Sequence, residues 1–275
     1  MLEQGYCPVW TGYLERQGDW AVREKEENAG LLVSIITVSY NSEKSIRRTI
    51  ESVLNQTYSK IEYHIVDGLS TDNTIEIARE YDEKFAEKGI KYIISSERDN
   101  GIYDAMNKGI LRSAGKIVGI INSDDWYEKN AVESAVNTYR ETEFDYYYAD
   151  INLIKENGKK IVKHSKQKRI VTSRHWNHPG SFVKRQVYKE LGLFRCEGIH
   201  DDFDFFLRVK RAGKKIVIQN ELHSNFTVGG VSNDKSLRKC RKRCLDRYKC
   251  YRNNGYSRLY FIECVLMEVM KYLVS

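Results

Sequence analysis

The sequence has no long hydrophobic run and very little proline. None of its apolar stretches approaches the roughly 20 residues that span a bilayer, and its first residues, MLEQGYCPVW, lack the basic and apolar regions of a secretion signal. The only prolines are Pro8 and Pro179, so no proline-rich linker divides the chain. These absences predict a cytoplasmic protein and leave open a peripheral contact with the inner face of a membrane.

Glycine-rich phosphate loops and paired cysteines are also missing. No GxGxxG follows the first apolar run, which argues against a dinucleotide oxidoreductase, and no glycine-rich loop there could cradle a triphosphate, which argues against a nucleotidylyltransferase. The six cysteines lack CxxC spacing, and His175 and His178 have no neighbouring Glu. We therefore expect no zinc site.

Positive charge is concentrated near the C-terminus. The chain carries a net +7, but residues 235–258 hold ten Lys or Arg and one acid, Asp246, so this segment is +9 and the rest of the chain is −2. Residues 259–274 are mostly apolar, yet too interrupted by charge to span a membrane. One hypothesis is that residues 235–274 contact an anionic membrane surface; the other is a packed helix with a solvated basic face.

Strand and helix patterns alternate from Leu31 onward. The runs LLVSIITV, IEYHIV, KYIIS and IVGIIN are rich in β-branched residues, and apolar residues at helical spacing predict helices starting near residues 42, 71 and 103. This alternation predicts an α/β fold, with a mostly parallel sheet and helices on both faces. Further on, the pattern predicts a tyrosine-rich strand at FDYYYAD and a hairpin around residues 156–158. It also predicts three helices, at residues 129–142, 185–191 and 201–212.

We divide the chain into three regions. Residues 1–30 form an N-terminal extension without a clear period, residues 31–232 form one α/β domain, and residues 233–275 form a basic and amphipathic helical tail. Nothing repeats internally, so we expect a single sheet.

Acids and amides follow each of the four predicted strands. In open α/β sheets, ligands bind beyond the carboxyl ends of the strands. Any one of these polar groups alone is typical of a turn or a helix cap, but four together indicate a ligand site. The adjacent Asp124 and Asp125 would repel each other unless a cation compensates, and hard divalent cations prefer such oxygen ligands.

Six segments, in the right order, resemble the family 2 glycosyltransferases of GT-A fold, in particular the non-processive bacterial enzymes of polysaccharide and cell-envelope synthesis. The segments are SIITVSYN, VDGLSTDNT, SERDNGIYDAMNKGI, NSDDWY, HPGSFVKRQVYKELGLF and HDDFDFFLR, within residues 33–232. The QxxRW segment and transmembrane helices of the processive synthases are not found. The resemblance implies a GT-A Rossmann-like fold and an inverting, metal-dependent transfer of one sugar.

The resemblance also implies a donor site for a nucleotide-sugar, most simply a UDP-sugar. Its expected residues are Tyr40, Asn41, Asp67, Asp99, Asn100, Gly101, Asn107 and Ser123. Asp67 would accept a hydrogen bond from a uracil-type ring N–H. Asn107 and Gly109 have a second interpretation, as ordinary helix surface and helix termination.

The metal is expected to be Mn²⁺ or Mg²⁺. Asn122-Ser123-Asp124 lies at the position of the family's DxD motif, so the resemblance makes Asp124 the first candidate ligand and Asp125 the second. Asn122 stands where the family usually has Asp.

The resemblance implies that Asp202, in the segment HDDFDFFLR, is the general base. Its apolar neighbours are compatible with this role, because they can tune a carboxylate for proton transfer. Asp201 and Asp204 are also explained by the preference for acids at helix N-termini. The resemblance places Trp176, His178, Pro179 and Gly180 on the acceptor side. Trp176 would either stack on a sugar or pack as a core aromatic.

We expect the chain to move a sugar from a nucleotide-sugar to a hydroxyl of a glycan or polyprenol-linked acceptor during surface polysaccharide synthesis. The alternative is a non-catalytic module that binds nucleic acid or another anionic surface through its basic tail. We expect no specific nucleic acid partner, because such a module would have no use for acids at the strand ends.

Overall fold

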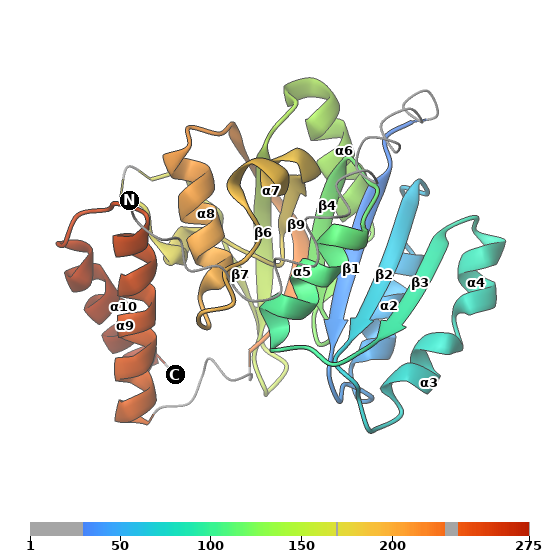
Figure 1. Ribbon diagram of the computed structural model, residues 1–275, viewed down its shortest axis with the longest axis horizontal. Coiled ribbons are helices and arrows are strands. Elements are labelled where there is room, and N and C mark those ends of the chain that lie inside the picture. The colour runs from blue at the N-terminus through green and yellow to red at the C-terminus, as the bar shows by residue number, and fades with distance from the viewer. Residues whose placement is uncertain (1–29, 169, 229–235, 275) are drawn as a thin grey trace.

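The computed structural model describes residues 30–168, 170–228 and 236–274. Most of the predicted extension at residues 1–30, and the first residues of the predicted tail at 233–275, lie outside this part. One mixed sheet forms the centre of the molecule, with strand order β3-β2-β1-β4-β8-β6-β9-β5 and with β7 paired to β6 (Figure 1). The strands are β1 (Val33–Ser39), β2 (Ile61–Asp67), β3 (Lys91–Ser96), β4 (Ile117–Asn122), β5 (Trp126–Tyr127), β6 (Tyr146–Ile154), β7 (Lys160–Lys163), β8 (Ser181–Lys184) and β9 (Ile216–Thr227).

The first half of the sheet is parallel, as predicted. Strands β1 to β4 pair in parallel, and every residue of β1 and β2 is buried, because helices cover both faces. The second half is mixed: β8 runs antiparallel to both β4 and β6, whereas β9 runs parallel to β6. The predicted tyrosine-rich strand and hairpin are β6 and β7, but β5, β8 and β9 were not predicted.

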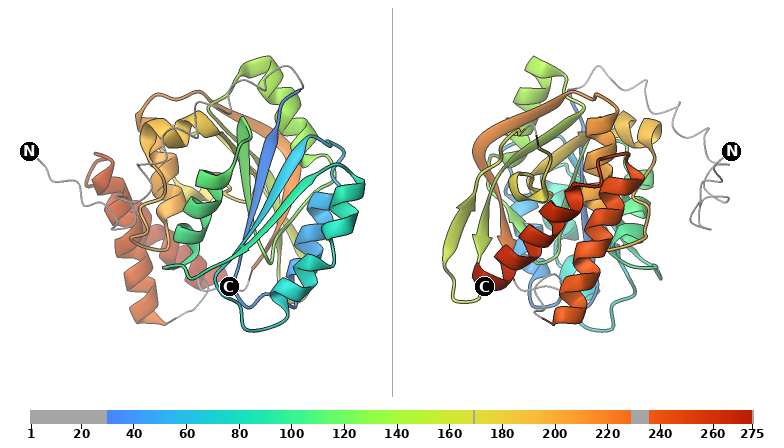
Figure 2. Two further views of the ribbon diagram at one scale, coloured as in Figure 1. Left: turned by 45° about the vertical axis from the view of Figure 1, so that its right-hand side comes forward. Right: turned by 90° about the vertical axis from the view of Figure 1, so that its left-hand side faces the viewer.

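The helices form two layers and a separate pair. One hydrophobic core lies under α2, α3, α4 and α6, and a second lies under α5, α7, α8 and part of α9. Figure 2 shows α9 and α10 side by side at one end of the molecule, where α9 packs against α8. The helices are α2 (Ile46–Leu54), α3 (Thr74–Arg79), α4 (Asp82–Glu87), α5 (Ile102–Arg112), α6 (Ala131–Thr142), the 3₁₀ turn η4 (Ser173–His175), α7 (Arg185–Leu191), α8 (Asp201–Arg211), α9 (Leu237–Asn253) and α10 (Tyr260–Val274).

Two local predictions were wrong. The helix expected from residue 71 is two short helices, α3 and α4, because the chain turns at Tyr81, whose buried hydroxyl donates to Glu51. Gly109 does not end a helix but lies inside α5, where a Cβ would come within 2.5 Å of Ile36 Cγ2. Its missing side chain lets α5 pack closely on β1.

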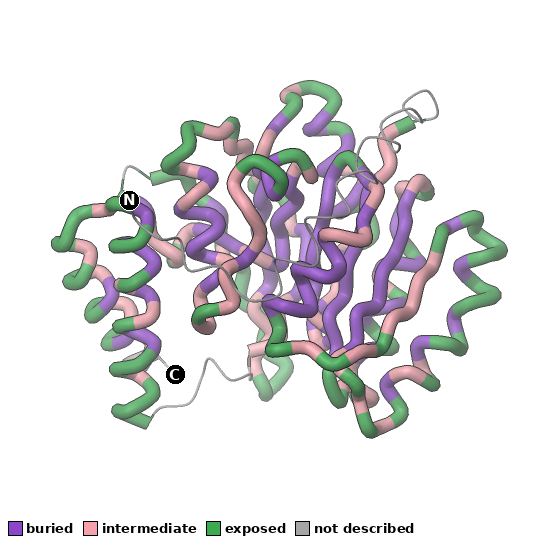
Figure 3. Tube along the Cα trace, viewed as in Figure 1, coloured by how far each residue is buried: buried purple, intermediate pink, exposed green. Residues whose placement is uncertain are grey.

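Figure 3 shows the strands of the sheet mostly buried and the surfaces of α9 and α10 mostly exposed. Among the described residues, no helix has both the length and the apolar character needed to cross a bilayer.

Candidate active site

The carboxyl ends of the four parallel strands meet at one edge of the sheet. The register pairs Ser39 of β1 with Asp67 of β2, Asp67 with Ser96 of β3, and Val38 of β1 with Asn122 of β4. The polar residues that follow these strands are therefore neighbours, although up to about 80 residues separate them in sequence.

Asp67 connects the ends of β1, β2 and β3 at this edge through hydrogen bonds. It is fully buried, and both carboxylate oxygens accept hydrogen bonds: Oδ1 from the hydroxyls of Ser39 and Ser70, and Oδ2 from the Ser96 hydroxyl and the Ser70 N–H. A carboxylate has about four acceptor positions, and all four are used. The predicted direct bond to a base N–H would require one of these serine contacts to open.

Tyr40, Gly68 and Asp99 form the exposed part of the same edge. Tyr40 is 64% exposed, and a Cβ added to Gly68 would lie 2.4 Å from Asp99 Oδ2 and 3.5 Å from the Tyr40 ring. The absence of a side chain at Gly68 thus creates room for both neighbours. Sequence reasoning gave Gly68 no role, and only the close approach of the loops reveals one.

The loop after β3 is held in shape by α5. Gly101 has φ +112°, a backbone conformation that residues other than glycine rarely adopt. Its N–H donates to Asp99 Oδ1. The backbone N–H of Asn100 donates to Asp104, and the buried Lys108 donates to the carbonyl of Arg98 and pairs with Asp104 at 3.5 Å. Asp104 and Lys108 were missed, although their i,i+4 spacing is a recognisable sign of a helix ion pair.

The predicted donor residues Asn41 and Ser123 lie at the ends of β1 and β4. Asn41 has φ +49°, and its Oδ1 accepts the N–H of Thr71, which ties the loop after β1 to the loop after β2. Ser123 shares a 2.7 Å hydrogen bond with Ser42. Ser42 thus connects the ends of β1 and β4, and α2 begins after Ser45.

Asp124 and Asp125 have opposite environments. Asp124 is partly exposed, and the partial burial of its carboxyl raises its pKa. No other described side chain donates a hydrogen bond to this carboxyl. Asp125 is fully buried, with Oδ1 accepting the Thr227 N–H and Oδ2 accepting from Asn122 at 3.4 Å. Burial, and then the charge of Asp124, hold the pKa of Asp125 well above its usual range. Asp125 therefore faces β9, and its prediction as a second metal ligand is corrected.

Arg48 of α2 is a further residue of this edge that sequence reasoning missed. Its guanidinium lies 3.6 Å from the centre of the Trp126 ring and donates to the carbonyl of Asp124 at 2.9 Å. The stacking and the hydrogen bond fix the turn that carries Asp124, and they place a positive charge beside it.

Asp202 lies at the start of α8 and is connected to α5. Its Oδ1 accepts the Tyr103 hydroxyl at 3.0 Å and the Phe203 N–H at 2.7 Å. No described residue reaches Oδ2. Burial, followed by the charge of Asp202, raises the pKa of Tyr103 far above its usual value, so Tyr103 remains a donor.

The two neighbouring acids of α8 are committed to structure. Asp201 accepts the backbone N–H groups of Glu197 and Gly198, and Asp204 pairs with Arg195 and Arg208. This arrangement agrees with their interpretation as helix-start acids. Asp201 and Asp204 are buried, whereas Asp202 is partly exposed and has an oxygen without a hydrogen bond.

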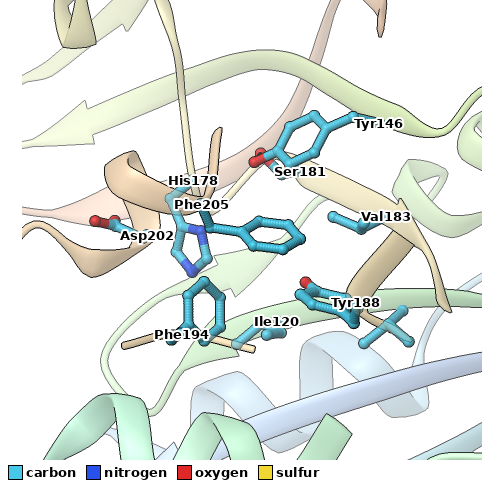
Figure 4. Close-up of a pocket in the computed structure, with 10 residues that line it drawn as sticks. Ile120, Tyr146, His178, Ser181, Val183, Tyr188, Phe194, Asp202 and Phe205 are labelled. Atoms are coloured by element: carbon cyan, nitrogen blue, oxygen red, sulfur yellow. The ribbon is translucent and has the colours of Figure 1, made fainter. Parts of the chain in front are cut away.

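Two of the predicted site residues, Asp202 and His178, line a cavity of about 10 Å³, the room of roughly one water molecule. Figure 4 shows His178 close to Phe194 and Phe205, with Asp202 at the edge of the group and its carboxylate pointing away from His178. Burial lowers the pKa of His178, which favours the neutral imidazole, and its Nε2 has no hydrogen-bond partner among the described residues.

The other acceptor-side residues and Asn107 are structural. Trp176 is buried, stacks on Phe206 and donates to the Tyr146 hydroxyl, so it is a core aromatic and not a sugar platform. Pro179 and Gly180 are buried, and a Cβ on Gly180 would lie 2.9 Å from the Ala149 carbonyl. Asn107 is buried, and its amide both donates to and accepts from the backbone of Phe194. All four residues are buried, so none of them is exposed to a ligand in this structure.

The mostly parallel sheet with helices on both faces and a polar edge at its strand ends defines an α/β fold of GT-A type. The profile of Glycosyl transferase family 2 matches residues 34–200, and the chain belongs to this family. The chain is 33% identical over 132 residues to the putative teichuronic acid biosynthesis glycosyltransferase TuaG of Bacillus subtilis, covering 48% of this chain and 51% of TuaG. It is 30% identical over 221 residues to chondroitin synthase of Escherichia coli, covering 74% of this chain and 32% of that protein.

Solved structures share the fold. S. aureus TarS in complex with UDP-GlcNAc superposes with a TM-score of 0.64 at 18% identity, covering 89% of this chain and 73% of that chain. The mannosyltransferase PcManGT from Pyrobaculum calidifontis, in complex with GDP-Man and Mn²⁺, gives 0.65 at 16% identity, covering 95% and 77%. The chain thus spans about half of TuaG and a third of chondroitin synthase, but most of these structures.

Proposed function

We propose that this protein transfers one sugar from a UDP-sugar to a hydroxyl of a glycan or lipid-linked acceptor in surface polysaccharide synthesis, with inversion at the anomeric carbon. Membership of family 2 supports the enzyme over a non-catalytic surface-binding module. The names of TuaG and chondroitin synthase support a polysaccharide product, and the UDP-GlcNAc complex of TarS supports a UDP donor. The GDP-Man complex of PcManGT makes GDP the competitor to test.

The observation that carries the proposal is that only one of the two carboxylate oxygens of Asp202 accepts hydrogen bonds. Tyr103 and the Phe203 N–H hold Oδ1, so the side chain is oriented, and Oδ2 is left to accept a proton. As Oδ2 takes the proton of the acceptor hydroxyl, the acceptor oxygen bonds to the anomeric carbon, and the bond from that carbon to the diphosphate breaks. The positioned base contributes about 10²–10⁴ in rate.

The donor would lie along the strand ends. Tyr40 offers an exposed ring for a nucleotide base, and Asp99, over Gly68, offers a carboxylate oxygen to ribose or sugar hydroxyls. Asn41, Asn100, Gly101 and Ser123 shape the loops around this space. In this proposal Asp67 acts mainly by holding the ends of β1, β2 and β3 together.

The residues near Asp124 fit a divalent cation that shares its coordination with the donor. Among the described residues, no three His, Cys, Asp or Glu side chains come together as a complete metal site. Asp124 is nevertheless a partly buried carboxylate with a raised pKa, and the nearby Asn122 Oδ1 is buried without a hydrogen-bond partner. Mg²⁺ and similar cations are commonly held by one or two carboxylates plus substrate phosphates. Such an ion, when bound, would stabilise the negative charge of the departing diphosphate.

Thermal unfolding of the purified protein with UDP, GDP, dTDP and CMP, each with Mn²⁺ or with EDTA, tests the donor class. A ligand at 100 times its Kd stabilises a fold by about 2.7 kcal/mol. We expect UDP with Mn²⁺ to raise Tm most and EDTA to reduce that rise. A larger shift with GDP would overturn the UDP assignment, and no shift with any nucleotide would overturn the proposed function.

A further inference from the structure

Over residues 260–270, the part of α10 whose side chains the structure describes, the outward face is entirely apolar. Its exposed positions fall in three pairs, one turn apart, and every one carries a large hydrophobic side chain; we call these residues the outer face. They are Phe261, Ile262, Val265, Leu266, Val269 and Met270, and the exposed Leu259 precedes them. A surface helix of a globular protein normally turns its polar side outward, and exposed apolar patches of this kind mark contact sites.

The inward side of α10 carries the charge instead. Glu268 is buried and pairs with Arg243 at 3.0 Å and with Arg247 at 3.3 Å, both buried in α9, and Glu263 accepts from Tyr251. Removing one partner of a buried ion pair leaves an uncompensated charge, so these contacts fix the rotation of α10. The outer face is therefore held outward by the packing of the hairpin formed by α9 and α10.

Basic side chains border the outer face. Tyr248 of α9 packs edge-on against Phe261, with ring centres 5.3 Å apart. Arg241 and Arg252 lie seven residues before and four after Tyr248, hence on the same side of α9, and both are exposed. Further exposed Lys and Arg side chains of the hairpin are Arg238, Lys242, Lys249 and Arg258.

We propose that the outer face of α10 inserts into the interface of an anionic phospholipid membrane, with the basic side chains of α9 contacting the lipid headgroups. An apolar helix face bordered by Lys and Arg has the composition of interfacial membrane helices. A second copy of the chain is the poorer occupant, because face-to-face pairing would bring two basic borders together. The part of the chain that the structure describes places nothing over this face.

The hairpin is joined to the helix that carries Asp202. The amide of Asn254, at the end of α9, donates to Asp204 at 2.7 Å, and the Cys250 thiol donates to the carbonyl of His200 at 3.6 Å. Membrane contact would thus hold the start of α8 close to the lipid surface, where a lipid-linked acceptor is available. The membrane inference itself does not depend on the proposed transfer reaction.

Co-sedimentation of the full chain with lipid vesicles tests the proposal. We expect binding to vesicles of phosphatidylcholine mixed with phosphatidylglycerol, weaker binding to phosphatidylcholine alone, and weakening by salt. The double variant Ile262→Ser with Leu266→Ser should lower the partition coefficient by about tenfold or more on both kinds of vesicle. Arg241→Gln with Lys242→Gln should lower it only on the anionic vesicles.

Matched controls lie on another hairpin. Ile161 and Val162 of β7 are both exposed apolar residues, so Ile161→Ser with Val162→Ser controls for the Ile262/Leu266 double variant. Lys159→Gln with Lys160→Gln removes the same amount of charge as the Arg241/Lys242 variant, and it should leave vesicle binding unchanged. Because all substituted side chains are exposed, circular dichroism and Tm should stay unchanged.

Three results would overturn the proposal. The first is equal vesicle binding by the wild type and by the Ile262/Leu266 variant. The second is a wild-type dimer in sedimentation velocity that becomes a monomer in that variant, which would make a second copy the occupant. The third is a full chain that binds no anionic vesicle. Nucleotide-induced Tm shifts are measured in parallel. A chain that binds nucleotide but no vesicle would overturn the membrane proposal and leave the proposed function standing.

Discussion

The two halves of the candidate site are built in different ways. The donor half uses residues that directly follow four parallel strands, so the sheet itself makes them neighbours. The acceptor half uses Asp202 at the start of α8 and Tyr103 of α5, which are 99 residues apart and meet only because two helices pack on one face of the sheet. Proximity thus comes from strand register in one half and from side-chain packing in the other.

The halves also differ in how they use acids. In the donor half, the fully buried Asp67 already accepts a hydrogen bond at every acceptor position. The acids proposed to contact the donor and its metal ion are the less buried Asp99 and Asp124. In the acceptor half, Asp201 and Asp204 are buried, whereas Asp202 is partly exposed and has an oxygen without a hydrogen bond. In both halves the functional candidates are the acids that the fold leaves less buried.

The largest effect is expected from Asp202→Asn, which removes the proton acceptor of the acceptor half. We predict a fall in kcat of about 10²–10⁴-fold, because an amide cannot act as a general base. Stabilisation by UDP with Mn²⁺ should be unchanged, since the donor half is intact. Transfer assays and thermal unfolding measure the two quantities; retention of kcat would exclude Asp202 as the base.

The next effect separates the adjacent acids of the donor half. Asp124→Asn should abolish the Mn²⁺-dependent part of the nucleotide stabilisation, up to about 2.7 kcal/mol at saturating ligand. Asp125→Asn should keep it, because Asp125 is buried and its raised pKa favours the neutral form that Asn imitates. Equal losses in both variants would contradict the assignment of Asp124 alone.

Two glycines test whether close packing serves binding or stability. Gly109→Ala would press a Cβ against Ile36 in the core, and we expect a loss of about 1–3 kcal/mol in the free energy of unfolding. Gly68→Ala would press on the end of the Asp99 side chain, which can move, so nucleotide affinity should fall more than stability. Chemical denaturation and UDP titration of both variants distinguish the outcomes; unaltered affinity in Gly68→Ala would remove Asp99 from the donor site.

Tyr103→Phe tests the packing contact that orients Asp202 within the acceptor half. Removing one hydrogen bond to a carboxylate that must be oriented should cost about 0.5–1.5 kcal/mol, or roughly 3- to 10-fold in kcat. The KM for the nucleotide-sugar should not change, because Tyr103 positions Asp202 and does not reach the strand ends. A rise in KM with constant kcat would instead place Tyr103 in the donor site.

The smallest effect concerns pH and Asp201. Burial raises the pKa of Asp201 to about 6, above its ordinary value of 3.8, so the folded state favours the protonated form. Its stabilising contribution is therefore complete below its unfolded pKa and is lost as pH rises through about 6. We expect Asp201→Asn to reduce the loss of stability between about pH 5 and pH 7 by about 1 kcal/mol. An identical slope in the variant and the wild type, from denaturant melts, would contradict this shift.

The sequence was most informative about the donor half. Apolar runs predicted the four parallel strands, and the polar residues after them predicted the ligand edge, because a strand's end is readable from composition alone. Even there it could not separate Asp124 from Asp125, since adjacent identical residues differ only in what the fold places around them. It also gave Gly68, Asp104 and Lys108 no role, because each acts through a contact with a different loop or strand end.

By itself, then, the sequence determined the α/β class, the family resemblance and the order of the strand-end residues, because these depend on local patterns and motifs. Only the tertiary structure decided that Trp176 and Asn107 are core contacts, that Asp202 keeps a free oxygen, and that α10 turns its apolar side outward. Burial and hydrogen-bond saturation are properties of assembled neighbours, and those neighbours come from distant parts of the chain.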